Sequence, residues 1–266
     1  MPYRKRYRVA FFSMTSCEGC QLMVLSSENE LPDILSNVNI VYFREAMSEK
    51  SSDYDIAFIE GSATTAKEVR KLRKIRAQAK LVITLGACSS TGGLNRLKNR
   101  FRIGELKESV YGVEASRSHA FDTMRVRAID EVIEVDHHLH GCPISKDEFI
   151  KTFNDLLLGL KPHTPNYPVC TDCKIAGNVC VFKKGGRCLG PVTRAGCDAI
   201  CVTYGSICWG CRGFVDSPNI TAHTETLANF GMGAEEASDF LGLYSTGLTG
   251  DTKVGKATKS TKSKQR

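Results

Sequence analysis

The sequence predicts an α/β protein: a parallel sheet in the first 160 residues, then an irregular cysteine-rich segment and a short helical part. Up to about residue 160, short β-branched or aromatic runs alternate with longer helical stretches, which is typical of an α/β sheet. Three prolines within Lys161–Pro168 mark a boundary. Eight of the twelve cysteines follow between residues 170 and 211. That segment has few apolar runs, so metal coordination would have to stabilise it.

The periodicity of apolar residues predicts the individual elements. Strands are expected at Tyr7–Met14, Val38–Phe43, Tyr54–Glu60, Leu81–Leu85 and Glu131–Val135. Helices are expected over most of Glu18–Ser36, over 65–79 and over Lys146–Leu158, with mostly loop and short helices between 87 and 130. One or two helices are expected within Ile220–Leu243, with a helix cap at Asn219 or Thr221.

Composition and charge exclude several classes of protein. The 266 residues are 42% hydrophobic and 24% charged, which rules out a disordered or collagen-like chain. No stretch approaches 18 consecutive apolar residues and the start lacks an export signal, so no transmembrane segment and a cytoplasmic location are expected. Of the net charge of +7, six positives lie in the last fourteen residues, which leaves +1 for the body. We therefore expect a disordered basic tail over 246–266 and no nucleic-acid binding.

The first four cysteines predict a metal site at the edge of the sheet. Cys17, Cys88 and Cys142 each follow a predicted strand, and Cys20 completes a CxxC pair. Ligands of an open α/β sheet bind at the carboxyl ends of its strands, where these loops converge. The segments SCEGC, GACSSTGG with Gly86, and HGCPI are rich in small residues, which allow backbone N–H groups to approach an anionic cofactor. The alternative for each cysteine is a buried apolar residue.

The other eight cysteines supply ligands for two more sites. They are Cys170, Cys173, Cys180, Cys188, Cys197, Cys201, Cys208 and Cys211. Three four-cysteine sites suit either zinc or 4Fe-4S clusters. Redox clusters explain better why the first set is spread over a domain with its own core, and three of them imply an electron relay. Sequential assignment divides the eight after Cys188, but ferredoxin-like clusters commonly exchange their fourth ligand, so the partition stays open.

The motifs resemble the small, electron-transferring subunit of nickel-iron hydrogenases, most closely the soluble sulfhydrogenase type. They are TSCEGCQL, IAFIEGSATT, LGACSSTGGL, HGCPISKDEF, PVCTDCKIAGNVC and CLGPVTRAGCDAICVTYGSICWGCRG, within residues 7 to about 215. The resemblance implies three 4Fe-4S clusters. It implies a flavodoxin-like domain over 1–162 that holds the proximal cluster on Cys17, Cys20, Cys88 and Cys142. A two-cluster ferredoxin-like domain over 163–218 and a helical extension over 219–245 would follow.

The resemblance also implies partners and one further site residue. Glu60 matches a family glutamate near the proximal cluster, where it could move protons or tune the potential; the alternative is a helix cap or a solvated loop acid. Gly86, in the segment GACSSTGG, is expected to contribute to binding the cofactor, and His137, His138 and His140 are expected to support the ligands or an interface. No residue here would cleave dihydrogen, so a nickel-iron large subunit is required. An Fe-S and flavin subunit that uses NAD(P) is implied downstream, with deazaflavin- and heterodisulfide-linked complexes as alternatives. The rival functions are a redox subunit of a sulfur reductase and a structural zinc protein.

Overall fold

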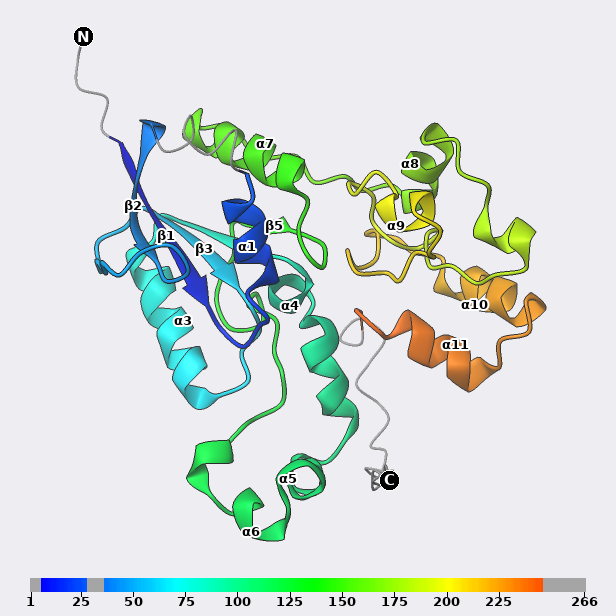
Figure 1. Cartoon of the computed structure of the whole chain (residues 1–266), viewed down its shortest axis with the longest axis horizontal. Helices are drawn as coiled ribbons and strands as arrows, with labels where there is room; N and C mark the ends of the chain where they lie inside the picture. The colour runs from blue at the N-terminus through cyan, green and yellow to red at the C-terminus, as the bar shows by residue number, and fades with distance from the viewer. Residues whose placement is uncertain (1–5, 28–35, 246–266) are drawn as a thin grey trace, which may run out of the picture.

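The computed structural model describes residues 6–27 and 36–245. Figure 1 shows two parts side by side, a sheet flanked by helices and a less regular part that carries α8 to α11. The helix predicted over most of Glu18–Ser36 is described as α1 (Gly19–Leu25), and its residues 28–35 lie outside the described residues, as does the tail predicted for 246–266.

A five-stranded parallel sheet forms the frame of the first part. Its strands are β1 (Tyr7–Ser13), β2 (Val38–Phe43), β3 (Ile56–Glu60), β4 (Leu81–Leu85) and β5 (His137–Leu139). The spatial order is β2-β1-β3-β4-β5, and every neighbouring pair is parallel. This is the order of flavodoxin-like domains, and the α/β class predicted from the sequence is confirmed. All five residues of β3 are buried, as expected for a parallel strand that is covered on both faces.

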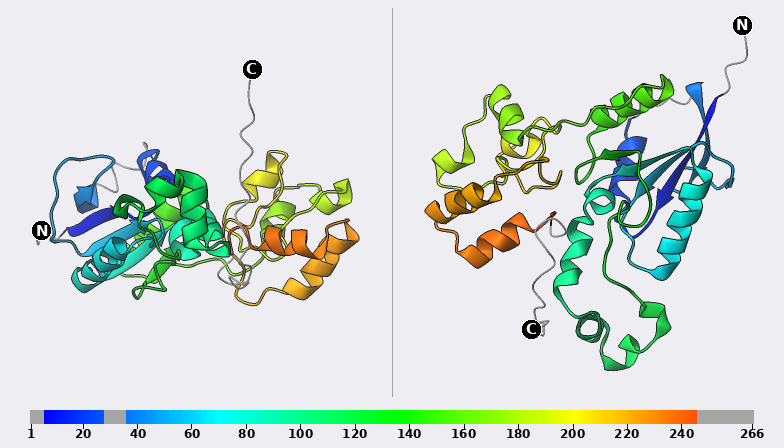
Figure 2. Two further views of the ribbon diagram at one scale, coloured as in Figure 1. Left: turned by 90° about the horizontal axis from the view of Figure 1, so that it is seen from below. Right: turned by 180° about the vertical axis from the view of Figure 1, so that it is seen from behind.

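Helices cover both faces of the sheet (Figure 2). On one face, α1 (Gly19–Leu25) and α7 (Lys146–Leu157) pack against a core that contains Phe11, Phe58 and Phe149. On the other face, α3 (Ala66–Gln78) buries Val69 and Leu72 together with its other apolar positions. Thr65 and Glu68 form a capping box at the start of α3, which satisfies amide groups that the helix leaves free.

The prediction of a strand at Glu131–Val135 is wrong. These residues form a turn in which the amides of Val132 and Ile133 both donate to the carbonyl of Ile129. The strand begins two residues after the predicted segment, at His137, because Asp136 accepts a 2.7 Å hydrogen bond from the amide of Val82 and starts the pairing with β4. The apolar residues of the predicted strand instead pack around the core beneath α3.

Short helices connect β4 to β5, as the sequence predicted for 87–130. They are α4 (Ala87–Ser90), η1 (Gly93–Arg100), α5 (Ile103–Tyr111), α6 (Val113–Ser116) and η2 (His119–Phe121). In Figure 1, α5 and α6 project away from the sheet, and α5 buries none of its residues. Tyr111 stacks on Phe121 with ring centroids 4.2 Å apart, which holds the two ends of this projection together.

The second part has a small core and little regular structure. It contains α8 (Val169–Ile175), η3 (Val181–Lys184), α9 (Ile200–Thr203), α10 (Ile220–Asn229) and α11 (Ala234–Leu241). Leu189 and Phe214 pack against Leu227 and Leu241 of the last two helices. The side chain of Asn219 accepts a 3.0 Å hydrogen bond from the amide of Ala222, so the predicted cap is confirmed. Among the described helices, none has the length and apolar character that crossing a membrane requires.

Candidate functional site

Four thiols meet at the carboxyl edge of the sheet and are termed the sheet-edge thiols. Cys17 follows β1, Cys20 lies in the first turn of α1, Cys88 lies in α4 after β4, and Cys142 follows β5. Burial raises the pKa of Cys88 to about 12, and the charges of Cys142 and Cys17 add to this effect. Burial also raises the pKa of Cys20, assisted by Glu60, Cys142 and Cys88. Thiols that raise each other's pKa share a small region, and a bound cation would be needed to hold them all as thiolates.

The strand order explains why these loops meet. The chain runs outward from β1 to β2 on one side and from β3 to β5 on the other, so a crevice opens between the carboxyl ends of β1 and β3. Cys17 follows the first of these strands, and Glu60 ends the second.

Gly86 provides space beside the sheet-edge thiols. Its φ of 82° lies in the left-handed region, and a Cβ atom there would overlap Sγ of Cys20 and stand 3.1 Å from the carbonyl of Gly141. The amide of Gly86 donates to the carbonyl of Leu139 at 2.7 Å, so it is not free to reach a sulfur atom. The glycine therefore lets α4 pass close to α1, which differs from the amide-donor role that the sequence suggested.

Glu60 is a buried carboxylate that holds the start of α1. Its Oε1 accepts from the amide of Cys20 at 2.9 Å, and its Oε2 accepts from the amide of Gln21 at 3.1 Å. The side chain is 2% exposed, so the alternative of a solvated loop acid is wrong. Burial raises the pKa of Glu60, although the amide hydrogen bonds oppose that shift. The carboxylate thus satisfies two amides of the first turn of α1 and sets the position of Cys20.

Four more thiols, termed the outer thiols, line a cavity of about 400 Å³ in the second part. They are Cys170, Cys173, Cys180 and Cys188. Burial raises the pKa of Cys170 to about 11, and Cys188, Cys173 and Cys180 act in the same direction. A Cβ atom at Gly190 would stand 3.3 Å from Sγ of Cys170 and 3.5 Å from Sγ of Cys188. The absence of a side chain at Gly190 keeps this space open.

The last four thiols, termed the middle thiols, line a smaller cavity of about 90 Å³. They are Cys197, Cys201, Cys208 and Cys211, and Cys142 lines the same cavity. Burial raises the pKa of Cys211 to about 11, and the charges of Cys197, Cys142 and Cys201 contribute. Cys208 also lines the cavity of the outer thiols.

Backbone amides connect the three groups of thiols in a fixed order. The amide of Cys142, a sheet-edge residue, donates a hydrogen bond to the thiol of Cys211, a middle residue. The amide of Cys208, another middle residue, lies 3.4 Å from Sγ of Cys188, an outer residue, and donates to it. The middle thiols therefore lie between the sheet-edge thiols and the outer thiols.

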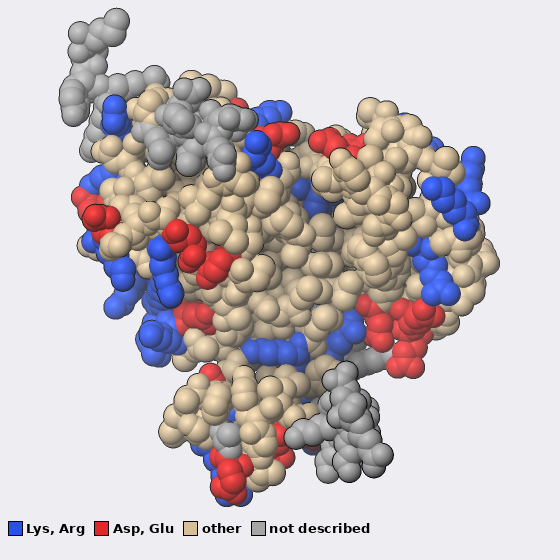
Figure 3. Space-filling model, viewed as in Figure 1, with Lys and Arg blue, Asp and Glu red and all other residues tan. Residues whose placement is uncertain are grey.

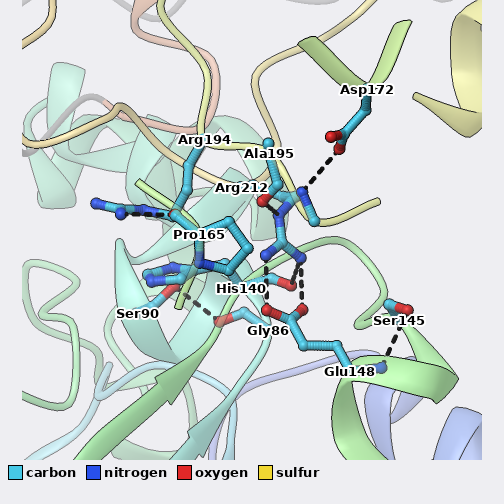
Figure 4. A network of polar contacts seen from close by, with 11 residues as sticks. Gly86, Ser90, His140, Ser145, Glu148, Pro165, Asp172, Arg194, Ala195 and Arg212 are labelled. Carbon is cyan, nitrogen blue, oxygen red and sulfur yellow. Dashed lines mark hydrogen bonds and ion pairs between the residues drawn. The ribbon is translucent and has the colours of Figure 1, made fainter. Parts of the chain in front are cut away.

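A buried arginine joins the two parts of the molecule (Figure 4). The guanidinium of Arg212 makes two hydrogen bonds to the carboxylate of Glu148 in α7, at 2.7 and 2.8 Å. It also donates to the carbonyl of His140 at 2.8 Å and to that of Ala195 at 2.7 Å. The Arg212 side chain is 1% exposed. Burial acts to lower the pKa of Arg212, but the hydrogen bonds and charge of Glu148 outweigh it and the net shift is upward. The Arg212–Glu148 ion pair, together with the hydrogen bond to the carbonyl of His140, therefore ties the segment before Cys142 to the segment that carries Cys211.

Sequence reasoning missed Tyr244, which follows α11 and lines the cavity of the middle thiols. Its hydroxyl is hydrogen-bonded to the thiol of Cys142. Burial raises the pKa of Tyr244, and the neighbouring charges of Cys142 and Cys211 raise it further. Arg212 and Glu148 were also missed, and only the position of Arg212 directly after Cys211 could have drawn attention to it.

The three histidines support the frame of the site. His138 shares a 2.8 Å hydrogen bond with Thr84 of β4, and His140 accepts from Arg212 through its carbonyl. Burial lowers the pKa of His137 to about 4, so its ring is neutral at pH 7.

Across residues 6–27 and 36–245, no three or more His, Cys, Asp or Glu side chains are grouped tightly enough to hold a single metal ion.

Comparison with known proteins places this chain in a family. Residues 17–156 match the family described as NADH ubiquinone oxidoreductase, 20 Kd subunit. The sulfhydrogenase 2 subunit delta of Pyrococcus furiosus is 32% identical over 83% of this chain and 92% of its own length. A subunit of the vhu-type F420-non-reducing hydrogenase of Methanocaldococcus jannaschii is 28% identical over 95% of this chain and 98% of its own.

Two solved structures resemble the fold. A chain of a NAD+-reducing [NiFe]-hydrogenase in the H2-reduced state superposes with a TM-score of 0.56 at 27% identity, covering 60% of this chain and 96% of that chain. A chain of the [NiFeSe] hydrogenase from Desulfovibrio vulgaris Hildenborough, at 18% identity, superposes with a TM-score of 0.52 over 81% of this chain and 96% of its own, which shows a shared fold. The chain therefore belongs to the NADH ubiquinone oxidoreductase 20 Kd subunit family and is, within it, a protein of the hydrogenase small-subunit type.

Proposed function

We propose that this chain is a cytoplasmic electron-transfer subunit of a nickel-iron hydrogenase and that it carries three 4Fe-4S clusters. The observation that supports this most directly is the convergence of four thiols from separate loops at one edge of the sheet. Zinc ribbons hold their ion with close pairs of ligands in one small unit, whereas these four span residues 17 to 142. When bound, each cluster supplies a one-electron carrier.

The residues fit such clusters. A single zinc ion needs four thiolates at about 2.3 Å from one point, whereas the outer thiols surround a cavity of about 400 Å³. The amides of Gly190 and Cys208 both donate to Sγ of Cys188 at 3.4 Å, and hydrogen bonds to sulfur stabilise the added negative charge of a reduced cluster. The charges of Cys188, Cys173 and Cys180 all raise the pKa of Cys170, which supports one cluster on these four cysteines and thus a sequential partition of the eight. Cys208 would then belong to the middle thiols and lie at their border with the outer thiols.

The order of the thiol groups supports a direction for the relay. The sheet-edge thiols would hold the cluster nearest the nickel-iron site, the middle thiols the next one, and the outer thiols the cluster from which electrons leave. The amide of Cys142 would give electrons a short hydrogen-bonded route from the sheet-edge thiols to the middle thiols. The amide of Cys208 would do the same between the middle thiols and the outer thiols. Glu60 and Tyr244 would serve the first cluster, Glu60 by fixing Cys20 and Tyr244 by donating to Cys142.

The partners follow from this arrangement. Leu22 and Leu94 are 55% and 43% exposed on α1 and η1, which flank the sheet-edge thiols, so apolar surface is available there for the large catalytic subunit. A relative is named the NAD-reducing hydrogenase HoxS subunit delta of Cupriavidus necator. This name supports a downstream Fe-S and flavin partner that uses NAD(P).

Metal analysis of the anaerobically purified complex tests the proposal. We expect about twelve iron atoms per chain, broad visible absorption and a co-purifying chain that contains nickel. Cys88→Ser should lose the first cluster and stop dihydrogen from reducing a viologen dye. Cys180→Ser, the matched change at an outer thiol, should lower the iron content equally and leave the first cluster in place. A colourless protein with about three zinc atoms would support the structural zinc alternative instead, and an intact complex without nickel would support a sulfur reductase.

A further inference from the structure

Four large apolar side chains form an exposed patch beyond the middle and outer thiols, termed the outer patch. Ile175 is 81% exposed, Val179 56%, Ile200 55% and Tyr204 83%. A hydrogen bond of 2.9 Å from Asn178 to Thr203 ties the two segments that carry them. Single exposed apolar residues need no explanation, but a contiguous patch marks an interaction site.

The outer patch lies where thiols reach the surface. Cys180 follows Val179 and Cys201 follows Ile200 in the chain, and both cysteines are exposed. Val179 also lines the cavity that the outer thiols surround. Anything that covers the patch therefore comes within a few side chains of two groups of thiols.

Basic residues border the patch. The segment between Cys173 and Cys188 contains Lys174, Lys183, Lys184 and Arg187 and no acidic residue. Arg187 is paired with Glu236 at 2.8 Å, whereas within the described ranges the three lysines are exposed and form no ion pair. Lys174 and Lys183 line the cavity of the outer thiols. Figure 3 shows Lys and Arg side chains gathered along the side of the molecule where α8 and η3 lie.

We infer that the outer patch is the docking surface for a redox protein that presents acidic residues around an apolar centre. This inference rests on the proposed function and names the chemistry of the electron acceptor. Carboxylates on the acceptor would face the three lysines, and its apolar centre would cover Ile175 and Tyr204. A second copy of this chain does not suit the surface, because lysines would face lysines and like charges oppose association. An anionic membrane would also match the charge, and binding to anionic vesicles is therefore one outcome of the test.

The test uses the complex of this chain with its large subunit, with dihydrogen as the electron donor. Three acceptors serve as probes: benzyl viologen, which is small and needs no docking; a plant-type [2Fe-2S] ferredoxin, which is acidic; and cytochrome c, which is basic. The variant is Lys174→Glu/Lys183→Glu/Lys184→Glu. The matched control, Lys67→Glu/Arg70→Glu/Lys74→Glu, makes the same change in net charge on the exposed face of α3.

We expect the first variant to lower kcat/KM for ferredoxin at least tenfold and to raise it for cytochrome c, since charged interfaces change association rates by tenfold or more. The control should leave both values and viologen reduction within about twofold. Because Lys174 and Lys183 line the cavity of the outer thiols, kcat/KM for each protein acceptor is divided by the rate of viologen reduction of the same preparation, which separates a loss of docking from a loss of the outer cluster. High salt should remove the difference between variant and wild type. Ile175→Ser/Tyr204→Ser should lower kcat/KM for ferredoxin at low and high salt.

Three results would overturn the inference. The first is an equal loss in both charge-reversal variants. The second is no loss in either one. The third is binding to phosphatidylserine vesicles that the variant abolishes while ferredoxin kinetics stay unchanged. Failure of the wild-type complex to reduce viologen with dihydrogen would instead contradict the proposed function.

Discussion

Removing the charge of Glu148 should destabilise the junction between the two parts of the protein. Glu148→Gln keeps the shape of the side chain but removes the charge that is hydrogen-bonded to the guanidinium of Arg212, which is 1% exposed. Breaking a buried ion pair by removing one partner costs roughly 3–5 kcal/mol. We expect the lower end, about 3 kcal/mol, because the amide can still accept one hydrogen bond and the carbonyls of His140 and Ala195 remain in place.

Anaerobic thermal unfolding of the cluster-loaded complex at a fixed scan rate measures this effect. At roughly 2–4 °C per kcal/mol for a chain of about this size, Glu148→Gln should lower Tm by about 6–12 °C. Asp147→Asn is the matched control, since Asp147 is also acidic, lies in the same first turn of α7 and is exposed. Its loss removes only a helix-dipole interaction of about 0.3–1 kcal/mol. Equal shifts of Tm in the two variants would refute the view that burial makes the Arg212–Glu148 pair important.

Three further predictions concern stability, cluster binding and potential. Hydrogen bonds from Arg8 hold the pKa of Asp55 well below its usual range, so this carboxylate adds stability above the unfolded pKa of about 3.9 and loses it as the pH falls below that value. Asp55→Asn should therefore lower Tm at pH 7 and flatten the decline of Tm below about pH 4. Gly86→Ala should lower the iron content by about a third, because the new methyl group overlaps Sγ of Cys20, whereas Gly104→Ala, with nothing within 4 Å of the new atom, should keep it. Tyr244→Phe should lower the midpoint potential of the first cluster in an EPR titration by about 40 mV, the equivalent of about 1 kcal/mol for a lost hydrogen bond to the cluster ligand.

Each of these has a result that would contradict it. An unchanged pH profile in Asp55→Asn would mean that its hydrogen bonds to Arg8 do not stabilise the fold. Full iron content in Gly86→Ala would mean that α4 can move away from α1 at little cost. An unchanged potential in Tyr244→Phe would mean that the hydroxyl does not donate to the cluster ligand in the loaded protein.

Local patterns were sufficient for most of the frame. Strands β2 and β4 and helix α3 lie where the apolar pattern predicts them, because a short continuous apolar run is typical of a buried strand and apolar residues three and four apart are typical of a helix with one buried face. The strand predicted for Glu131–Val135 failed for the same reason. Its apolar residues are buried beneath α3, but in a turn, and a three-residue strand at His137–Leu139 is too short to show a period.

The sequence by itself determined the cysteine inventory, the α/β order and the family, because ligand type and short-range periodicity are properties of neighbouring residues. Only the tertiary structure decided how the thiol groups follow one another, what Gly86 does, and which side chains hold the two parts together. Arg212 and Glu148 are 64 residues apart in the chain, and Tyr244 reaches Cys142 from beyond the last described helix. Contacts over such separations depend on how whole elements pack, and no local pattern encodes them.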